Sequence, residues 1–213
     1  MSGGHGVGGS SPPSPTFPFM TKTKLRTIIK QKLGSLSKEA IAAGSGAVIR
    51  AVCAEEAYKM SVALFAFMSL PAEVQTAGLI RRALAAGKRV FVPRVAETGL
   101  MFHEISAVED ASVLHAYGMA EPPAVLPCFP ACDGDAEPAC MLVPGLAFDR
   151  HKNRLGRGRG YYDAFLTALR RDHPHMRCTL IGVCLNIQLV DALPVTAHDV
   201  PVDIVLTESE RIA

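Results

Sequence analysis

Apolar side chains alternate between helical and strand spacing along most of the chain. From Thr21, four of them recur at the spacing of one helix face. These four are Leu25, Ile28, Ile29 and Leu33. Ser37 is a suitable N-cap for a second helix, which we expect to run to about Tyr58. Residues 61–68 are then almost continuously apolar, which is typical of a strand covered on both faces.

The alternation continues towards the C-terminus. Residues 76–86 return to helical spacing and end at Gly87, and residues 89–95 (RVFVPRV) predict the next strand. A strand, a helix and a strand at this spacing predict a parallel pair with a right-handed crossover. Further strands are predicted at residues 100–105, 140–148, 179–185 and 202–207, and a helix at 162–172. The pattern predicts a single α/β domain, a three-layer sandwich with a mainly parallel, mixed central sheet.

Composition narrows the class of protein. The chain has 213 residues, which fits one domain, and its net charge of +2 does not indicate a nucleic-acid or membrane-surface partner. No apolar run reaches the roughly 18 residues of a membrane span. Six scattered cysteines suggest a reducing compartment. Cys128, Cys132 and Cys140 lack a CxxC pair and a neighbouring histidine, so the sequence does not favour a zinc site there.

Two segments are poor in core-forming residues. Residues 1–20 consist mainly of Gly, Ser and Pro, and we expect them to be a disordered extension ahead of a domain at 21–213. They contain no Arg and no apolar core, so they resemble neither a mitochondrial presequence nor a secretory signal. A cytoplasmic location is therefore expected in preference to a mitochondrial one. Residues 128–138 are rich in turn formers and acids, which predicts a surface loop.

The candidate chemistry is concentrated in residues 149–166, DRHKNRLGRGRGYYDAFL, between a predicted strand and a predicted helix. Glycines and free N–H groups ahead of a helix N-terminus form an anion cradle. Five crowded cations repel one another unless an anion lies among them. They are Arg150, Lys152, Arg154, Arg157 and Arg159. The segment predicts a polyphosphate site, with Asp163 as an oxygen ligand for magnesium; the alternative is a flexible basic loop.

Two more features have alternative interpretations. Lys22, Arg26 and Lys30 share one helix face, which is either a solvated face or a second set of phosphate contacts. Asp199 precedes the last predicted strand, where an aspartate usually caps or turns the chain. The segment RGRGYY also admits an RNA- or nucleotide-binding interpretation without catalysis, in which arginines contact phosphates and tyrosines stack on bases.

The segments VPGLAFD (143–149) and NRLGRGRGYYDAFL (153–166) resemble the signature of the 5-formyltetrahydrofolate cyclo-ligases, also called 5,10-methenyltetrahydrofolate synthetases. Lys22 with Arg26, MSLPAEVQT (68–76) and GKRVFVPR (87–94) match the same family in its order. The resemblance extends from about residue 22 to residue 207. It implies a ligase that uses ATP to convert 5-formyltetrahydrofolate, with or without a polyglutamate tail, to 5,10-methenyltetrahydrofolate, ADP and phosphate. Mg²⁺ is the implied cofactor, and a monomer without nucleic-acid or membrane partners is expected.

The resemblance also implies roles for individual residues. Arg157, Arg159 and Tyr161 would act on the reacting groups, with both arginines near the transferred phosphoryl group. Met68 and Glu73 would bind the folate, and Glu73 is suited to accept hydrogen bonds from the pterin N–H groups. Asp163 and Asp199 would bind magnesium. The predicted ATP contacts are Lys22, Arg26, Arg154, Leu155, Gly156, Arg157, Gly158, Arg159, Gly160, Tyr161 and Tyr162, of which the last six would also contact the folate.

Two residues depart from the family pattern. Lys152 stands where the family usually has Gly, and a lysine with positive φ is strained. Either Asn153 takes the left-handed position or the turn differs. Arg159 stands where relatives carry Gly or Lys, so a planar fork replaces a point charge.

Overall fold

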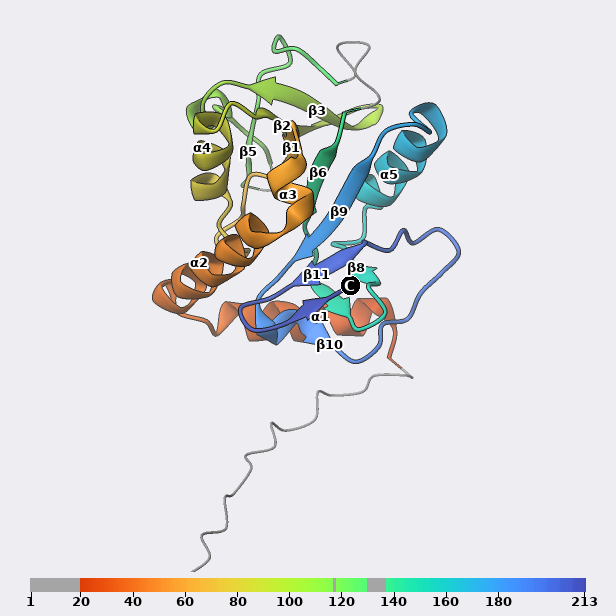
Figure 1. Cartoon of the computed structure of the whole chain (residues 1–213). Helices are drawn as coiled ribbons and strands as arrows, with labels where there is room; N and C mark the ends of the chain where they lie inside the picture. Colours follow the sequence, from red (N-terminus) through yellow and green to blue (C-terminus); the bar gives the residue numbers. More distant parts are fainter. Residues whose placement is uncertain (1–19, 117, 130–136) are drawn as a thin grey trace, which may run out of the picture.

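A seven-stranded sheet, in the order β12-β11-β9-β6-β1-β2-β3, forms the centre of the protein (Figure 1). The computed structural model describes residues 20–116, 118–129 and 137–213. The strands are β1 (Ala63–Phe65), β2 (Arg89–Ala96), β3 (Gly99–Ile105), β6 (Ala139–Val143), β9 (Cys178–Val183), β11 (Ile204–Leu206) and β12 (Arg211–Ile212). The pairs from β11 to β2 are parallel, whereas β12 and β3 pair antiparallel at the edges. The predicted mainly parallel, mixed sheet is confirmed.

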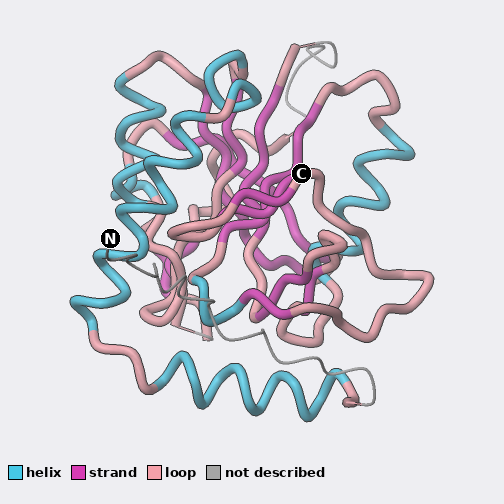
Figure 2. The backbone as a smooth tube through the Cα atoms, turned by 60° about the horizontal axis from the view of Figure 1, so that its bottom comes forward, coloured by secondary structure: helices cyan, strands magenta, loops and turns pink. Residues whose placement is uncertain are grey.

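Helices cover both faces of this sheet. Helices α2 (Lys38–Ala54), α3 (Glu56–Met60) and α4 (Ala77–Ala85) lie on one side, and α5 (Tyr161–Asp172) lies on the other (Figure 1). Helix α1 (Lys22–Gly34) runs along one end of the molecule, as the tube in Figure 2 shows. The predicted three-layer sandwich is therefore present.

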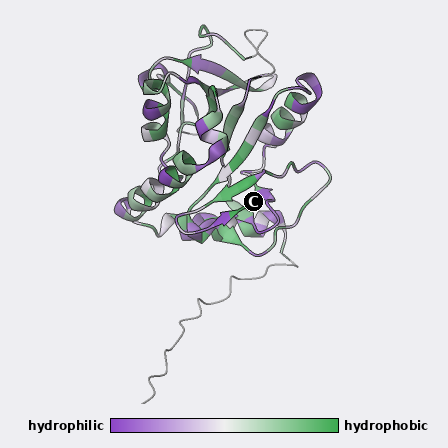
Figure 3. Ribbon diagram, viewed as in Figure 1, coloured by the Kyte–Doolittle hydropathy of each residue, from purple (hydrophilic) through white to green (hydrophobic). Residues whose placement is uncertain are grey.

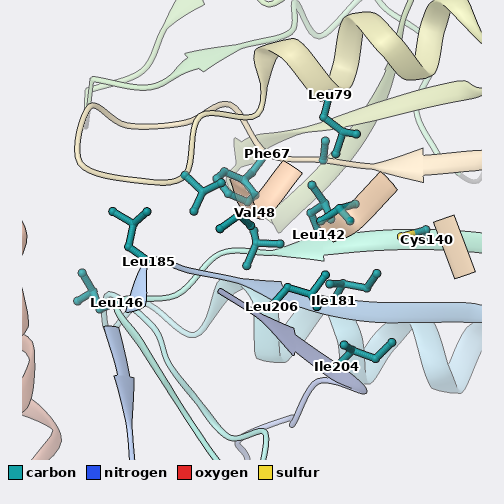
Figure 4. Close-up of a cluster of buried hydrophobic side chains, with 14 of the residues drawn as sticks. Val48, Phe67, Leu79, Cys140, Leu142, Leu146, Ile181, Leu185, Ile204 and Leu206 are labelled. Carbon is teal, nitrogen blue, oxygen red and sulfur yellow. The ribbon is translucent and has the colours of Figure 1, made fainter. Parts of the chain in front are cut away.

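Two hydrophobic cores lie on the two faces of the sheet. Along β6, Cys140 and Leu142 point into one core, while Met141 and Val143 belong to the other. This alternation follows from the two-residue period of a strand, and burial of both faces explains why the strands are apolar throughout. Figure 3 shows the central strands as mainly hydrophobic ribbons. Figure 4 shows part of the first core, where Val48 of α2 and Leu79 of α4 cover the sheet.

Short elements connect the main ones. A three-stranded sheet has the order β10-β7-β8, and β4 pairs with β5 in a hairpin. Their bounds and those of two 3-10 helices are β4 (Val113–Leu114), β5 (Ala120–Glu121), β7 (Ala147–Asp149), β8 (Arg154–Leu155), β10 (Leu189–Val190), η1 (Val108–Asp110) and η2 (Asn186–Gln188). The small sheet carries the start of the glycine-rich segment.

Three predicted element bounds were wrong. The strand predicted at 140–148 is two strands, because Pro144 has no N–H for a ladder bond and the chain bends at Leu146. The helix predicted from Ser37 to about Tyr58 is interrupted at Glu55, whose ψ of 135° is extended. Only three residues of the run 61–68 pair as a strand, although Ala66 and Phe67 are also buried. Apolar runs report burial, which loops next to a sheet share with strands.

Most of the predicted extension at residues 1–20, and residues 130–136 of the predicted loop, lie outside the described residues. Among the described residues, no helix has the length and apolar character needed to cross a bilayer. Cys132 is not described, and the remaining cysteines are free thiols. Burial raises the pKa of the Cys140 thiol to about 12, as expected for a cysteine that acts as a small hydrophobic residue.

Candidate active site

A cavity of about 950 Å³ opens beside the ends of β1 and β6. Phe67 and Met68 follow β1, and Pro144 and Gly145 follow β6, so the cavity lies at the carboxyl ends of parallel strands. Every residue to which the family resemblance gives a role lines it. These residues are Lys22, Arg26, Met68, Glu73, Arg154, Leu155, Gly156, Arg157, Gly158, Arg159, Gly160, Tyr161, Tyr162, Asp163 and Asp199. Two of the five crowded cations do not line it: Lys152 lies outside the lining, and Arg150 pairs with Glu210 instead.

A tight turn between β7 and β8 leads into the glycine-rich segment. Asp149 is fully buried, and its carboxylate accepts hydrogen bonds from His151 N (2.9 Å) and Asn153 N (2.8 Å). Lys152 itself takes the left-handed conformation, with φ of 68°, and its carbonyl accepts from Val202 N at 3.1 Å. The glycine-like backbone is therefore retained with a lysine, and Asn153 does not take the left-handed position.

The glycine-rich segment contacts α1 and leads into α5. Arg26 Nε donates to the carbonyl of Gly156 at 2.9 Å, which fixes the segment to α1. Gly158 has φ of 108°, and Gly160, the N-cap of α5, has φ of 71°; L side chains rarely adopt either value. The first N–H groups of a helix point out of its N-terminus, which in α5 lies at the cavity. Gly160 has no side chain to cap them, so they are available to an anion.

The cationic face of α1 lies at the cavity. Lys22, Arg26 and Lys30 all line it, so this helix face is turned towards the cavity. Lys22 forms an ion pair with Asp199. Asp199 also accepts from Thr196 N and Thr196 Oγ1, so it turns its own loop as well as facing α1. Burial raises the pKa of Asp199, but the bonds from Lys22 and Thr196 outweigh it and hold that pKa below its usual value.

Arg154 and Asp163 form a second ion pair, between β8 and α5. Arg154 Nη2 lies 2.8 Å from Asp163 Oδ1, and its guanidinium lies 5.6 Å above the centre of the Tyr162 ring. Only 4% of the Arg154 side chain is exposed, and its buried Nε has no hydrogen-bond partner in the described part of the chain. Asp163 Oδ1 also accepts from Val200 N at 3.2 Å, which joins α5 to the loop that carries Asp199.

Glu73 and Arg157 form a third ion pair, which joins the loop after β1 to the glycine-rich segment. Arg157 Nη2 lies 2.6 Å from Glu73 Oε1, and the backbone N–H of Leu70 donates to Glu73 Oε2 at 3.0 Å. The Glu73 side chain is 12% exposed, whereas that of Arg157 is 44% exposed. The residues assigned to folate and to phosphate are thus already in contact.

Tyr162 is held in the wall of the cavity. Its ring meets Phe102 of β3 edge to face, and its buried hydroxyl has no hydrogen-bond partner among the described residues. Burial raises the pKa of this hydroxyl, and the nearby Glu73 carboxylate raises it further, against the opposing effect of Arg154. The ring of Tyr162 is thus in contact with both Phe102 and Arg154.

The oxygen donors at the cavity fit a magnesium ion that arrives with a nucleotide. Asp163 Oδ2 and Asp199 Oδ1 accept no hydrogen bond in the part of the chain that the structure describes. The described residues contain no cluster of three His, Cys, Asp or Glu side chains that could hold a metal alone. Mg²⁺ usually takes one or two carboxylates together with phosphate oxygens and waters, so two aspartates beside a phosphate cradle suit it.

Sequence reasoning missed other residues at the site. Glu121 of β5 lines the cavity although it is almost fully buried, and its Oε1 accepts from Val95 N at 2.9 Å. Asp149 lies outside the cavity but organises the turn ahead of the glycine-rich segment. The sequence signal that could have revealed Asp149 is an acid placed directly after a long apolar run. No local pattern distinguishes Glu121, because the segment around it is short and irregular.

The comparisons with known proteins agree with the family resemblance of the sequence. A sequence model of the 5-formyltetrahydrofolate cyclo-ligase family matches residues 19–208. The chain belongs to the 5-formyltetrahydrofolate cyclo-ligase family. One relative, the probable 5-formyltetrahydrofolate cyclo-ligase of Caenorhabditis elegans, is 29% identical over 90% of this chain and 94% of its own. The 5-formyltetrahydrofolate cyclo-ligase of Saccharomyces cerevisiae is 30% identical, over 87% of this chain and 94% of its own.

A solved structure shares the cyclo-ligase fold. The 5,10-methenyltetrahydrofolate synthetase of Aquifex aeolicus is 28% identical and superposes with a TM-score of 0.71, over 90% of this chain and 92% of the other. The family resemblance and the α/β fold expected from the sequence are thus both confirmed.

Proposed function

We propose that this protein is a 5-formyltetrahydrofolate cyclo-ligase that uses MgATP. It transfers the γ-phosphoryl group to the oxygen of the N5-formyl group, which makes that oxygen a leaving group. N10 attacks the activated carbon and loses its proton, the carbon–oxygen bond breaks, and 5,10-methenyltetrahydrofolate, ADP and phosphate are released. Membership of the family and the names of the relatives support this assignment.

One observation carries the proposal: a single cavity brings together a phosphate cradle, two aspartates and a loop suited to the folate. Phosphoryl transfer needs positioning and charge neutralisation more than a covalent nucleophile. Lys22, Arg26 and the N–H groups of the glycine-rich segment would hold the triphosphate. Arg157 and Arg159, with Tyr161, would lie against the transferring group and the substrate.

The remaining residues would orient the two substrates. Met68 offers an apolar contact for the folate, and Glu73 offers a carboxylate to the pterin N–H groups. Arg154 is too deeply buried to reach far into the cavity, so it would act mainly by holding Asp163 in place. Mg²⁺, held by Asp163 and Asp199, would neutralise charge on the phosphates.

The activity is tested by near-ultraviolet absorbance of methenyltetrahydrofolate on mixing the protein with 5-formyltetrahydrofolate, ATP and Mg²⁺. We expect a rise that requires ATP, and its absence at high protein concentration would refute the proposal. The metal assignment is tested by a magnesium titration of the same rate. Asp163→Asn should need more Mg²⁺ for half-maximal rate, and an unchanged titration would remove Asp163 from the metal site.

A further inference from the structure

Three ion pairs between described residues that line the cavity share one feature. In each pair the cation is assigned to the nucleotide, and the carboxylate is assigned to a different ligand. The pairs are Lys22 with Asp199, Arg154 with Asp163, and Arg157 with Glu73. In the first two pairs the carboxylate is assigned to the metal that accompanies the nucleotide. In the third pair the carboxylate is assigned to the folate, so this pair connects the nucleotide side of the cavity to the folate side.

Both carboxylate oxygens of Glu73 already accept a hydrogen bond. Oε1 accepts from Arg157 at 2.6 Å, and Oε2 accepts from Leu70 N at 3.0 Å. The Leu70 bond fixes the carboxylate within its own loop, since the two residues are three positions apart. A carboxylate oxygen can accept two hydrogen bonds, so a ligand that donates to Oε1 either shares it with Arg157 or displaces Arg157. A largely buried carboxylate that loses one donor without gaining another is destabilised, so the exchange has to be direct.

The Arg157 side chain has room to move from one hydrogen-bond partner to another. It stands between Gly156 and Gly158, and 44% of its side chain is exposed, so it can swing without disturbing the core. A guanidinium binds a phosphate at least as well as a carboxylate, and it does so through the same N–H groups. While Nη2 donates to Glu73, only the other N–H groups of the guanidinium are available to a phosphate, and the Glu73 carboxylate beside them would repel it.

We infer that Arg157 exchanges Glu73 for the triphosphate when the nucleotide binds, and that this exchange frees Glu73 for the pterin N–H groups. Nucleotide and folate then bind with positive coupling, because each ligand removes one member of the ion pair that opposes the other. The inference rests on the proposed function, and it adds that the Arg157–Glu73 pair is what links the two substrates.

Thermodynamic linkage requires the coupling between the two ligands to be reciprocal. If the nucleotide tightens folate binding by some factor, the folate must tighten nucleotide binding by the same factor. Couplings between two sites are typically about 5–150-fold, and for one charge-assisted hydrogen bond to a largely buried carboxylate we expect about tenfold.

The experiment measures the dissociation constant of 5-formyltetrahydrofolate by calorimetry, with and without a saturating β,γ-imido analogue of ATP and Mg²⁺. The analogue cannot transfer its phosphoryl group, so binding is measured without turnover. The ratio of the two dissociation constants is the coupling factor. The wild-type protein should give a factor of about ten, and the reciprocal titration of the analogue should give the same value.

Variants of the pair test its role. Arg157→Leu leaves Glu73 permanently free of its cation, and Glu73→Gln removes the charge that holds Arg157. Each should reduce the coupling factor to about one, whatever its effect on the separate dissociation constants. Arg157→Lys retains a charge and should retain part of the coupling. The control is Glu109→Gln, since Glu109 and Arg81 form an ion pair of 2.9 Å that does not line the cavity.

The outcomes separate this inference from the proposed function. Binding of both ligands with a wild-type coupling factor near one would overturn the inference and leave the activity intact. Wild-type coupling that persists in Arg157→Leu would also overturn it, because another contact would then carry the linkage. A protein that binds neither ligand would refute the proposed function, and the inference with it.

Discussion

The carboxylate of Asp149 stabilises the turn before the glycine-rich segment, and its substitution tests this role. Its buried carboxylate accepts four hydrogen bonds: from His151 N and Asn153 N on Oδ1, and from Asn153 Nδ2 (3.0 Å) and Leu193 N (2.9 Å) on Oδ2. In Asp149→Asn, one oxygen becomes an NH₂ group that cannot accept. Two of the four donors then face another donor.

The expected loss of stability follows from these bonds. A hydrogen bond to a charged group contributes about 1.5–3 kcal/mol. The Asn153 amide can turn and present its oxygen, but Leu193 N is a fixed backbone donor and stays unsatisfied. We therefore expect Asp149→Asn to lower the free energy of unfolding by about 2–5 kcal/mol.

Urea unfolding followed by circular dichroism measures this loss as a lower midpoint at an unchanged slope. The matched control is Glu210→Gln, which removes an exposed ion pair with Arg150 beside the same turn and should cost less than about 1 kcal/mol. A loss below about 1 kcal/mol in Asp149→Asn, or a loss equal to that of the control, would refute the claim that this carboxylate holds the turn.

Three further outcomes are expected. Lys152→Gly should raise the free energy of unfolding by up to about 1 kcal/mol, because the relief of strain at the left-handed lysine exceeds the added entropy of the unfolded chain. Urea unfolding should show this as a higher midpoint, and a lower midpoint would contradict it. Gly182→Ala should cost about 1–3 kcal/mol in thermal unfolding, since its Cβ would lie 2.4 Å from a ring carbon of Phe148, and an unchanged melting temperature would show that the ring yields freely. The pKa of Asp199 is lower in the folded state, so its contribution exists above the unfolded pKa and is lost as pH falls through the folded one. The stability difference between wild type and Asp199→Asn should therefore be greatest at neutral pH and shrink in acid, and a constant difference would refute the Lys22 pairing as its source.

The order of helices and strands could be predicted because burial imposes a period on each element. The stripe Leu25, Ile29 and Leu33 and the alternating residues of β6 report which faces are covered, and these faces are covered in the structure. The element ends could not be predicted equally well. Residues 61–68 and 140–148 are buried beyond the paired strand, and an apolar run does not say where hydrogen bonding stops.

The sequence by itself determined the local chemistry: glycines ahead of a helix, with arginines between them and an aspartate after them, predict an anion site wherever the segment lies. Only the tertiary structure decided which groups meet there. Lys22 contacts Asp199 across 177 positions, and Arg157 contacts Glu73 across 84. Hydrophobic packing of α1 and of the sheet sets those distances, and no single residue at either end of an ion pair encodes its partner. The same packing gave Lys152 its left-handed backbone, because Asp149 and Val202 hold the turn from both sides.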